Sequence, residues 1–266
     1  MSLEWLLIYL SLGAFVGFMA GLLGVGGGGI LVPLLASIFA YQGWPAEHVV
    51  HLALGTSMAV MIVSASSSTC AHAAKNMVLW MVVKGMAPGI IIGAFITTHV
   101  ASHFSSYYIA IFFAAFMALI SIQMFVNWSP APSGKPFTVG SMTTVGGGIG
   151  SVSALAAVGG GFLTVAYLTY KNTEMKKAVG TSAAIGLPIA VAGTIGYIVS
   201  GWSTTSNQEW TVGFVYIPAF ITIAVASYVT APYGAQLSQR LPNASLKKIF
   251  GVVTLALSAK MLYSIA

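Results

Sequence analysis

Long apolar runs that carry almost no charge are the feature of this sequence that most restricts its fold. A bilayer core takes about 20 apolar residues per helix. Six runs of about that length extend over residues 47–74, 77–101, 104–127, 179–200, 210–230 and 246–266. Only 5% of the 266 residues are charged, whereas soluble domains carry about 25%. The sequence therefore predicts an all-α polytopic membrane protein.

Two further apolar runs, 3–41 and 137–170, are each too long for one crossing and too short for two full crossings. Glycines interrupt both of them. The first contains Gly24-Val25-Gly26-Gly27-Gly28-Gly29, and the second contains Gly159-Gly160-Gly161. We predict that each run is a helical hairpin that enters the membrane, turns at its glycines and returns to the same face.

The basic residues favour these hairpins, because Lys and Arg near membrane ends lie mainly on the cytoplasmic side. If every run crossed the membrane once, three basic residues of the main clusters would lie on one side and six on the other. Returning hairpins place all nine of these basic residues on one side. Both termini are then predicted to be periplasmic. The clusters are Lys75 and Lys84; Lys135; Lys171, Lys176 and Lys177; and Arg240, Lys247 and Lys248, while Lys260 stands apart.

The two halves of the chain resemble each other. The stretch 27–31 recurs as 159–163, with Pro33 opposite Val165, and 54–59 recurs as 179–184. Repetition in opposite orientation is typical of secondary transporters that bind substrate near the midplane. We predict two inverted repeats of about five segments each, residues 1–127 and 137–266, joined by a Pro/Gly linker over 128–136. Their hairpins are expected to meet near the midplane.

The glycine turns predict an anion site. Non-helical backbone survives inside hydrocarbon only where it is buried in protein or lines a cavity. Glycine permits positive φ and close approach of a ligand, and the helix that follows presents unpaired N–H groups. The alternative is that the glycines and the Gly-Thr-Ser segments only pack helices together. The predicted substrate-binding residues are Gly26, Gly27, Gly28, Gly29, Thr56, Ser57, Gly159, Gly160, Gly161, Thr181 and Ser182.

Other reactive side chains give weaker signals. His72 is a candidate gate or proton site, with a structural histidine as the alternative. The single cysteine, Cys70, cannot form an intramolecular disulfide and has no companion ligands, so we expect a packed small residue and no metal site. No cofactor is predicted. Without a basic helix, nucleic-acid binding is not expected. The remaining histidines, expected at the interface, are His48, His51, His99 and His103.

In order and spacing, the motifs resemble the sulfite exporter TauE/SafE family, which includes toluene sulfonate uptake permeases. The resemblance covers nearly the whole chain. It rests on residues 21–29 with Pro33, on Gly55-Thr56-Ser57, on Cys70-Ala71-His72 before Lys75-Asn76, and on Gly159–Gly161 through Gly180-Thr181-Ser182 to Gly196-Tyr197. The residues alone indicate that the substrate is an anion, and the resemblance implies that this anion contains sulfur.

The resemblance implies a secondary transporter that works by alternating access in the bacterial inner membrane. Its substrate would be sulfite, thiosulfate or an organosulfonate such as sulfoacetate. A potential of about 100 mV is worth roughly 2.3 kcal/mol per charge, so a negative cytoplasm favours efflux. An anion channel and a cation-coupled carrier of another small anion are the alternatives. A membrane-embedded enzyme subunit is not expected, and a homo-oligomer is left open.

Overall fold

A computed structural model of the chain describes residues 3–23, 27–126, 137–205, 208–238 and 240–265. Within these ranges the chain is almost entirely helical. The elements are α1 (Leu3–Leu23), α2 (Gly28–Tyr41), α3 (Ala46–Ala73), α4 (Trp80–Ala101), α5 (Ser106–Val126), α6 (Val139–Ala156), α7 (Gly161–Tyr170), α8 (Met175–Gly201), β1 (Thr211–Val212), β2 (Val215–Tyr216), α9 (Ile217–Ser238) and α10 (Asn243–Ile265). The predicted linker 128–136 lies outside the described residues.

Six of the described helices are long and apolar enough to cross a membrane: α1, α3, α4, α5, α8 and α9. The runs 47–74, 77–101, 104–127 and 179–200 correspond to α3, α4, α5 and α8, and the run 246–266 corresponds to α10. The predicted all-α membrane architecture is therefore confirmed.

The run predicted over 210–230 begins differently in the structure. Its first residues form a short hairpin, in which Thr211 pairs with Tyr216 and Val212 with Val215. Trp210 and Gly213 have positive φ angles of 64° and 54°, which no helix accommodates. The membrane helix α9 therefore begins only after this hairpin and continues to Ser238.

Both glycine-broken runs fold back on themselves. At the open end of the first pair, the Trp5 and Tyr41 rings lie 6.1 Å apart, which places the start of α1 beside the end of α2. At the open end of the second, the Phe137 and Tyr167 rings lie 6.3 Å apart. The helices that form these hairpins differ in length, however. Helix α1 has 21 residues and is itself long enough to span, whereas α7 has 10.

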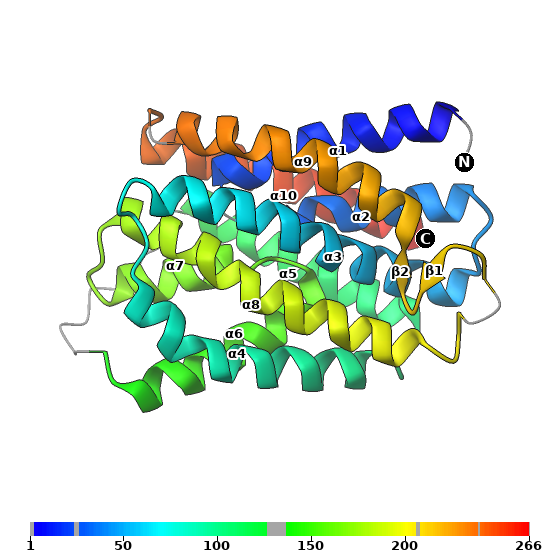
Figure 1. The fold of residues 1–266 in the computed structure, drawn as a ribbon, viewed down its shortest axis with the longest axis horizontal. Helices are drawn as coiled ribbons and strands as arrows, with labels where there is room; N and C mark the ends of the chain where they lie inside the picture. The colour runs from blue at the N-terminus through cyan, green and yellow to red at the C-terminus, as the bar shows by residue number, and fades with distance from the viewer. Residues whose placement is uncertain (1–2, 24–26, 127–136, 206–207, 239, 266) are drawn as a thin grey trace.

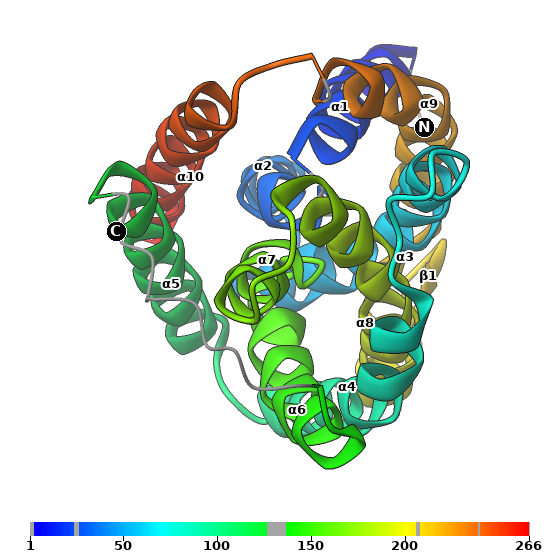
Figure 2. The ribbon, with the colours of Figure 1, turned by 90° about the vertical axis from the view of Figure 1, so that its left-hand side faces the viewer.

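The short helices α2 and α7 lie inside a ring formed by the longer helices (Figure 2). In Figure 1, α1 and α9 run along the top, α4 and α6 along the bottom, and α3 and α8 between them. Small residues allow these pairs to pack closely. A Cβ atom on Gly13 would lie 2.6 Å from the Ile223 carbonyl oxygen, and one on Gly146 would lie 2.5 Å from that of Met86. Packing is thus the role of these helical glycines.

Matched contacts support the predicted internal repeat. The contact of Gly13 with Ile223 in the pair α1–α9 has its counterpart in the contact of Gly146 with Met86 in α6–α4. Helices α3 and α8 run antiparallel. Gly193 of α8 contacts Met58 of α3, and Gly186 of α8 lies near Ala65 of α3. Residue numbers therefore increase along α3 in the direction in which they decrease along α8. Helices α3 and α8, which correspond in the predicted repeat, therefore run in opposite directions, and the inverted repeat of the whole halves stays a prediction.

The connections α3–α4, α7–α8 and α9–α10 lie at one end of the molecule, on the left in Figure 1, and both termini lie toward the other end. These three connections include or adjoin the basic clusters at 75–84, 171–177 and 240–248. The arrangement agrees with the predicted sidedness. Which end faces the cytoplasm stays a prediction.

Candidate functional site

Each hairpin turns at a glycine in the left-handed region. Gly27 has φ 76° and is the N-cap of α2, and Gly160 has φ 67° and is the N-cap of α7. Neither residue has a side chain that could cap the helix, so the first N–H groups of both helices are left without a side-chain partner. Both helix starts are buried. Each turn therefore presents polar hydrogens and the positive end of a helix inside the protein.

This geometry corrects the alignment of the two halves by one residue. The sequence places Gly27 opposite Gly159, but Gly160 is the residue that shares its backbone conformation and its N-cap position. Pro33 consequently corresponds to Ala166, not to Val165. A run of three or more glycines has no internal landmark, so the sequence could not fix this register.

The tips of the two hairpins touch. A Cβ atom on Gly28 would lie 2.4 Å from the Ala157 carbonyl oxygen, and one on Gly29 would lie 3.0 Å from a Val158 methyl group. Ala157 itself has φ 47° and ends α6. Gly28 therefore allows the first tip to pack on the backbone of the second. Gly26, also predicted for the site, lies outside the described residues.

The space beside the first turn is small and apolar. A cavity of about 10 Å³ lies there, which is room for about one water molecule. Its lining is mainly apolar, with Met19, Ala20, Met117, Val158 and Leu257, and Thr254 also lines it. The first turn is thus packed against apolar side chains in this conformation.

The Gly-Thr-Ser segments make a reciprocal contact between the halves. Thr56 Oγ1 accepts the backbone N–H of Tyr216 at 3.0 Å, just before α9. Thr181 Oγ1 accepts the backbone N–H of Leu79 at 2.9 Å, at the N-cap of α4. Each threonine therefore caps a helix of the other half.

The glycine before each threonine makes room for this cap. A Cβ atom on Gly55 would lie 2.1 Å from the Phe214 carbonyl oxygen, and one on Gly180 would lie 2.4 Å from that of Met77. Phe214 and Met77 each precede by two residues the N–H that the threonine accepts. The glycine and the threonine thus dock one extended segment together, which the sequence alone did not indicate.

The serines of the two segments differ. Ser57 is fully buried, and its Oγ has no partner among the described residues. Ser182 is equally buried and donates to the Val179 carbonyl oxygen at 2.8 Å. Thr181 lies five residues before Gly186, which contacts the second turn at the Gly159 oxygen. That separation is about 7.5 Å along the helix, so the structure does not bring Thr181 onto the turn.

His72 is 2% exposed, and neither of its ring nitrogens has a hydrogen-bond partner among the described residues. At helical spacing it shares one buried face of α3 with Ser57, Ser64 and Ser68. Cys70 lies on the opposite side of the helix and is exposed. The expectation of a packed cysteine was therefore wrong.

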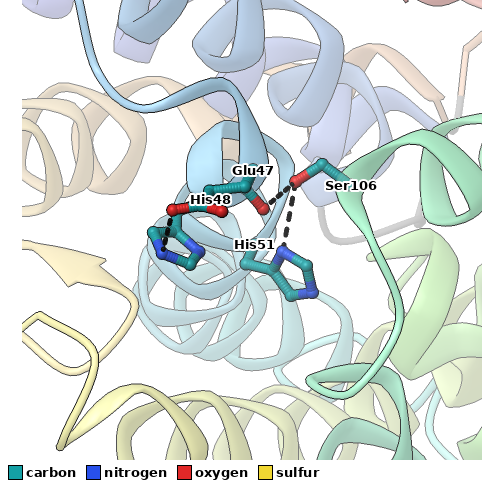
Figure 3. Close-up of polar contacts among 4 residues, drawn as sticks. All are labelled: Glu47, His48, His51 and Ser106. Carbon is teal, nitrogen blue, oxygen red and sulfur yellow. Dashed lines mark hydrogen bonds and ion pairs between the residues drawn. The ribbon is translucent and has the colours of Figure 1, made fainter.

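His51 makes contacts that hold neighbouring helices together (Figure 3). The side chain is buried, with Nδ1 3.2 Å from Ser106 Oγ and Nε2 3.3 Å from the Ala101 carbonyl oxygen. Ser106 also donates to the Glu47 carbonyl oxygen at 2.6 Å. His48 lies 3.3 Å from the Glu47 carboxylate, at the protein surface. These contacts join the start of α3 to the α4–α5 connection.

Two hydroxyl groups near the second turn were not predicted as site residues. Thr164 and Ser153 are both fully buried, and neither hydroxyl has a partner among the described residues. Isolated Ser and Thr residues are common in apolar helices, so no sequence signal distinguished them. Among all the residues that the structure describes, no group of three or more His, Cys, Asp and Glu side chains could hold a metal ion.

Comparison with known proteins identifies relatives along nearly the whole chain. The family model described as "Sulfite exporter TauE/SafE" matches residues 9–261. A "Probable membrane transporter protein" of Haemophilus influenzae is 31% identical over 258 residues, which cover 97% of this chain and 98% of the relative. A protein of the same description from Methanocaldococcus jannaschii is 26% identical, covering 96% and 97%. No solved structure gives a significant match.

Proposed function

The chain belongs to the sulfite exporter TauE/SafE family, and from this premise we propose that it moves a small sulfur-containing anion across the bacterial inner membrane. Its relatives are described as membrane transporters, and the protein is a membrane transporter of this kind. The proposed substrate is sulfite, thiosulfate or an organosulfonate such as sulfoacetate.

The observation that carries the proposal is the contact of the two hairpin tips, in which Gly28 at the start of α2 lies against Ala157 at the end of α6. Each tip also holds a buried helix N-terminus that begins at a glycine. One N-terminus stabilises an anion by only about 0.3–2 kcal/mol, while an isolated buried anion costs much more. Two turns and nearby hydroxyl groups are therefore needed together. The resulting affinity is moderate, because no described Lys or Arg is buried. Moderate affinity suits a carrier that must release its cargo.

The Gly-Thr-Ser hydroxyl groups are the proposed additional donors. Thr56 and Thr181 each accept an N–H in the described structure. A hydroxyl group that accepts one hydrogen bond still has its own hydrogen to donate. Ser57, whose hydroxyl has no described partner, is the freest of the four. A movement of about 7.5 Å along the helix, close to one and a half turns, would be required to bring Thr181 to the second turn.

The packed tips support a carrier over an open channel. Gly28 lies directly on the Ala157 carbonyl, and the cavity beside the first turn has room for about one water. An anion can therefore enter only if the hairpins move apart. We propose that the two halves rock about the tips, which alternately opens the site to either side.

Efflux is the proposed direction. The chain has four acidic residues and no Asp, and the Glu residues lie near helix ends, so the intramembrane carboxylates that usually carry protons are missing. A negative cytoplasm drives an anion outward without coupling. His72 is the proposed gate or proton site near the predicted cytoplasmic end.

Counterflow in vesicles tests this function. Purified protein is reconstituted and loaded with unlabelled sulfite, thiosulfate or sulfoacetate, and entry of the labelled anion is followed under imposed potentials. A carrier gives saturable entry that internal anion accelerates. Flux that does not saturate would favour the channel. Absence of flux for all three anions, in protein shown to be folded, would contradict the proposal.

A further inference from the structure

The two hairpin turns are chemically unequal, and the difference concerns the residues on either side of each turn. Corresponding positions follow from the shared left-handed glycines, Gly27 and Gly160. Four residues later the first turn has Leu31 and the second has Thr164; seven residues earlier the first has Ala20 and the second has Ser153. The same register is fixed independently by the contacts of α1 with α9 and of α6 with α4 described above.

Thr164 faces the second turn. Its Oγ1 lies 3.1 Å from the position that a Cβ atom on Gly160 would occupy, beside methyl groups of Ile189 and Ile185 at 2.7 and 3.3 Å. This direction is expected, because helical side chains lean toward the N-terminus of their helix. The hydroxyl is fully buried and has no hydrogen-bond partner among the described residues. A buried hydroxyl without a partner destabilises the folded protein, so a ligand is its expected partner.

The backbone beside Thr164 supplies further donors. The N–H groups of Gly161, Phe162 and Leu163 have no acceptor among the described residues. Helix α7 has 10 residues, enough to give its first turn a partial positive charge. Each of these groups can donate to an oxyanion.

The first turn has no hydroxyl group at the position that corresponds to Thr164. Its counterparts Ala20 and Leu31 are apolar and buried, and Ala20 lines the small apolar cavity beside that turn. An oxyanion placed there would keep backbone donors but lose the hydroxyl group that Thr164 supplies at the second turn. The first turn can instead contact an apolar part of the substrate or close the site.

We infer that the second turn is the main seat of the anion, with Thr164 as a direct donor to a sulfonate or sulfite oxygen. This inference rests on the proposed function and assigns its two turns different roles. The apolar first turn faces the organic part of a sulfonate.

The test compares Thr164→Val with Thr169→Val, a matched control on the same helix. The Thr169 hydroxyl donates to the Val165 and Ala166 carbonyl oxygens within its own helix. In vesicles, Thr164→Val is expected to raise the half-saturating concentration of sulfite and sulfoacetate about ten-fold or more, the usual cost of losing a donor to a charged group. Thr169→Val keeps the wild-type value, and Thr164→Ser restores saturation at low concentration.

Thermal unfolding of the purified variants separates binding from structure. Because the Thr164 hydroxyl has no partner in the described structure, Thr164→Val is expected to unfold at the wild-type temperature or above it. Saturation of Thr164→Val at the wild-type concentration would overturn the inference and leave the proposed function intact. A wild-type protein that carries none of the three anions would overturn both.

Discussion

Thr181, on α8, accepts the backbone N–H of Leu79 at the start of α4, and so a residue of the second half caps a helix of the first. Thr56 makes the corresponding bond to Tyr216. The two bonds tie the halves together at opposite ends of the antiparallel pair α3 and α8. Any rocking of one half against the other must preserve or break them.

Loss of this cap is expected to destabilise the protein. In Thr181→Val the half-buried Leu79 N–H loses its acceptor, which lowers the free energy of unfolding by about 1–3 kcal/mol. Thr181→Ser keeps an oxygen and is expected to lose less. Thermal unfolding in detergent measures the difference. Wild-type stability in Thr181→Val would show that the bond contributes nothing to folding.

Separating the hairpin tips is expected to abolish transport. A Cβ atom in Gly28→Ala would lie 2.4 Å from the Ala157 carbonyl oxygen, whereas no atom lies within 4 Å of one on Gly148. Vesicle flux is therefore expected to disappear in Gly28→Ala and to continue in the control Gly148→Ala. Both variants should still reach the membrane. Normal flux in Gly28→Ala would rule out the tip contact as part of the site.

The His51 contacts are expected to matter for stability and not for substrate affinity. In His51→Leu the ring contacts with the Ser106 hydroxyl group and the Ala101 carbonyl oxygen are lost, at a cost of about 1–3 kcal/mol. His99→Leu is the control, because His99 is exposed. Unfolding curves give the stability, and half-saturating concentrations give the affinity. A change in affinity alone would indicate that His51 belongs to the transport path.

Much of the fold could be predicted from apolar length. The ends of α3, α4 and α5 differ from the predicted runs by three residues or fewer, because charged and polar residues bound those runs. The start of α9 could not be predicted. The hairpin at Thr211–Tyr216 is as apolar as the helix that follows, and only its positive φ angles distinguish it.

The candidate site was less predictable than the fold. Glycine runs indicated both turns, but the role of Thr56 and Thr181 as caps depends on backbone N–H groups about 100 or more residues away in sequence, at Tyr216 and Leu79. The role of Thr164 could not be predicted from the sequence, because it depends on Gly160 being the residue at which the second hairpin turns. Tertiary contacts, which no local pattern encodes, decide these roles.

Returning hairpins and inverted halves require that Lys75 and Lys176 face the same compartment, and sided labelling measures this directly. In a Cys70→Ala background, exposed cysteines are introduced by Lys75→Cys, Lys176→Cys, Ser105→Cys and Ser203→Cys and treated in intact cells with a maleimide that cannot cross the membrane. We expect only Ser105→Cys and Ser203→Cys to react, while Lys75→Cys and Lys176→Cys react after the membrane is opened. Labelling of Lys75→Cys and Lys176→Cys from opposite sides would contradict the architecture on which the anion site depends.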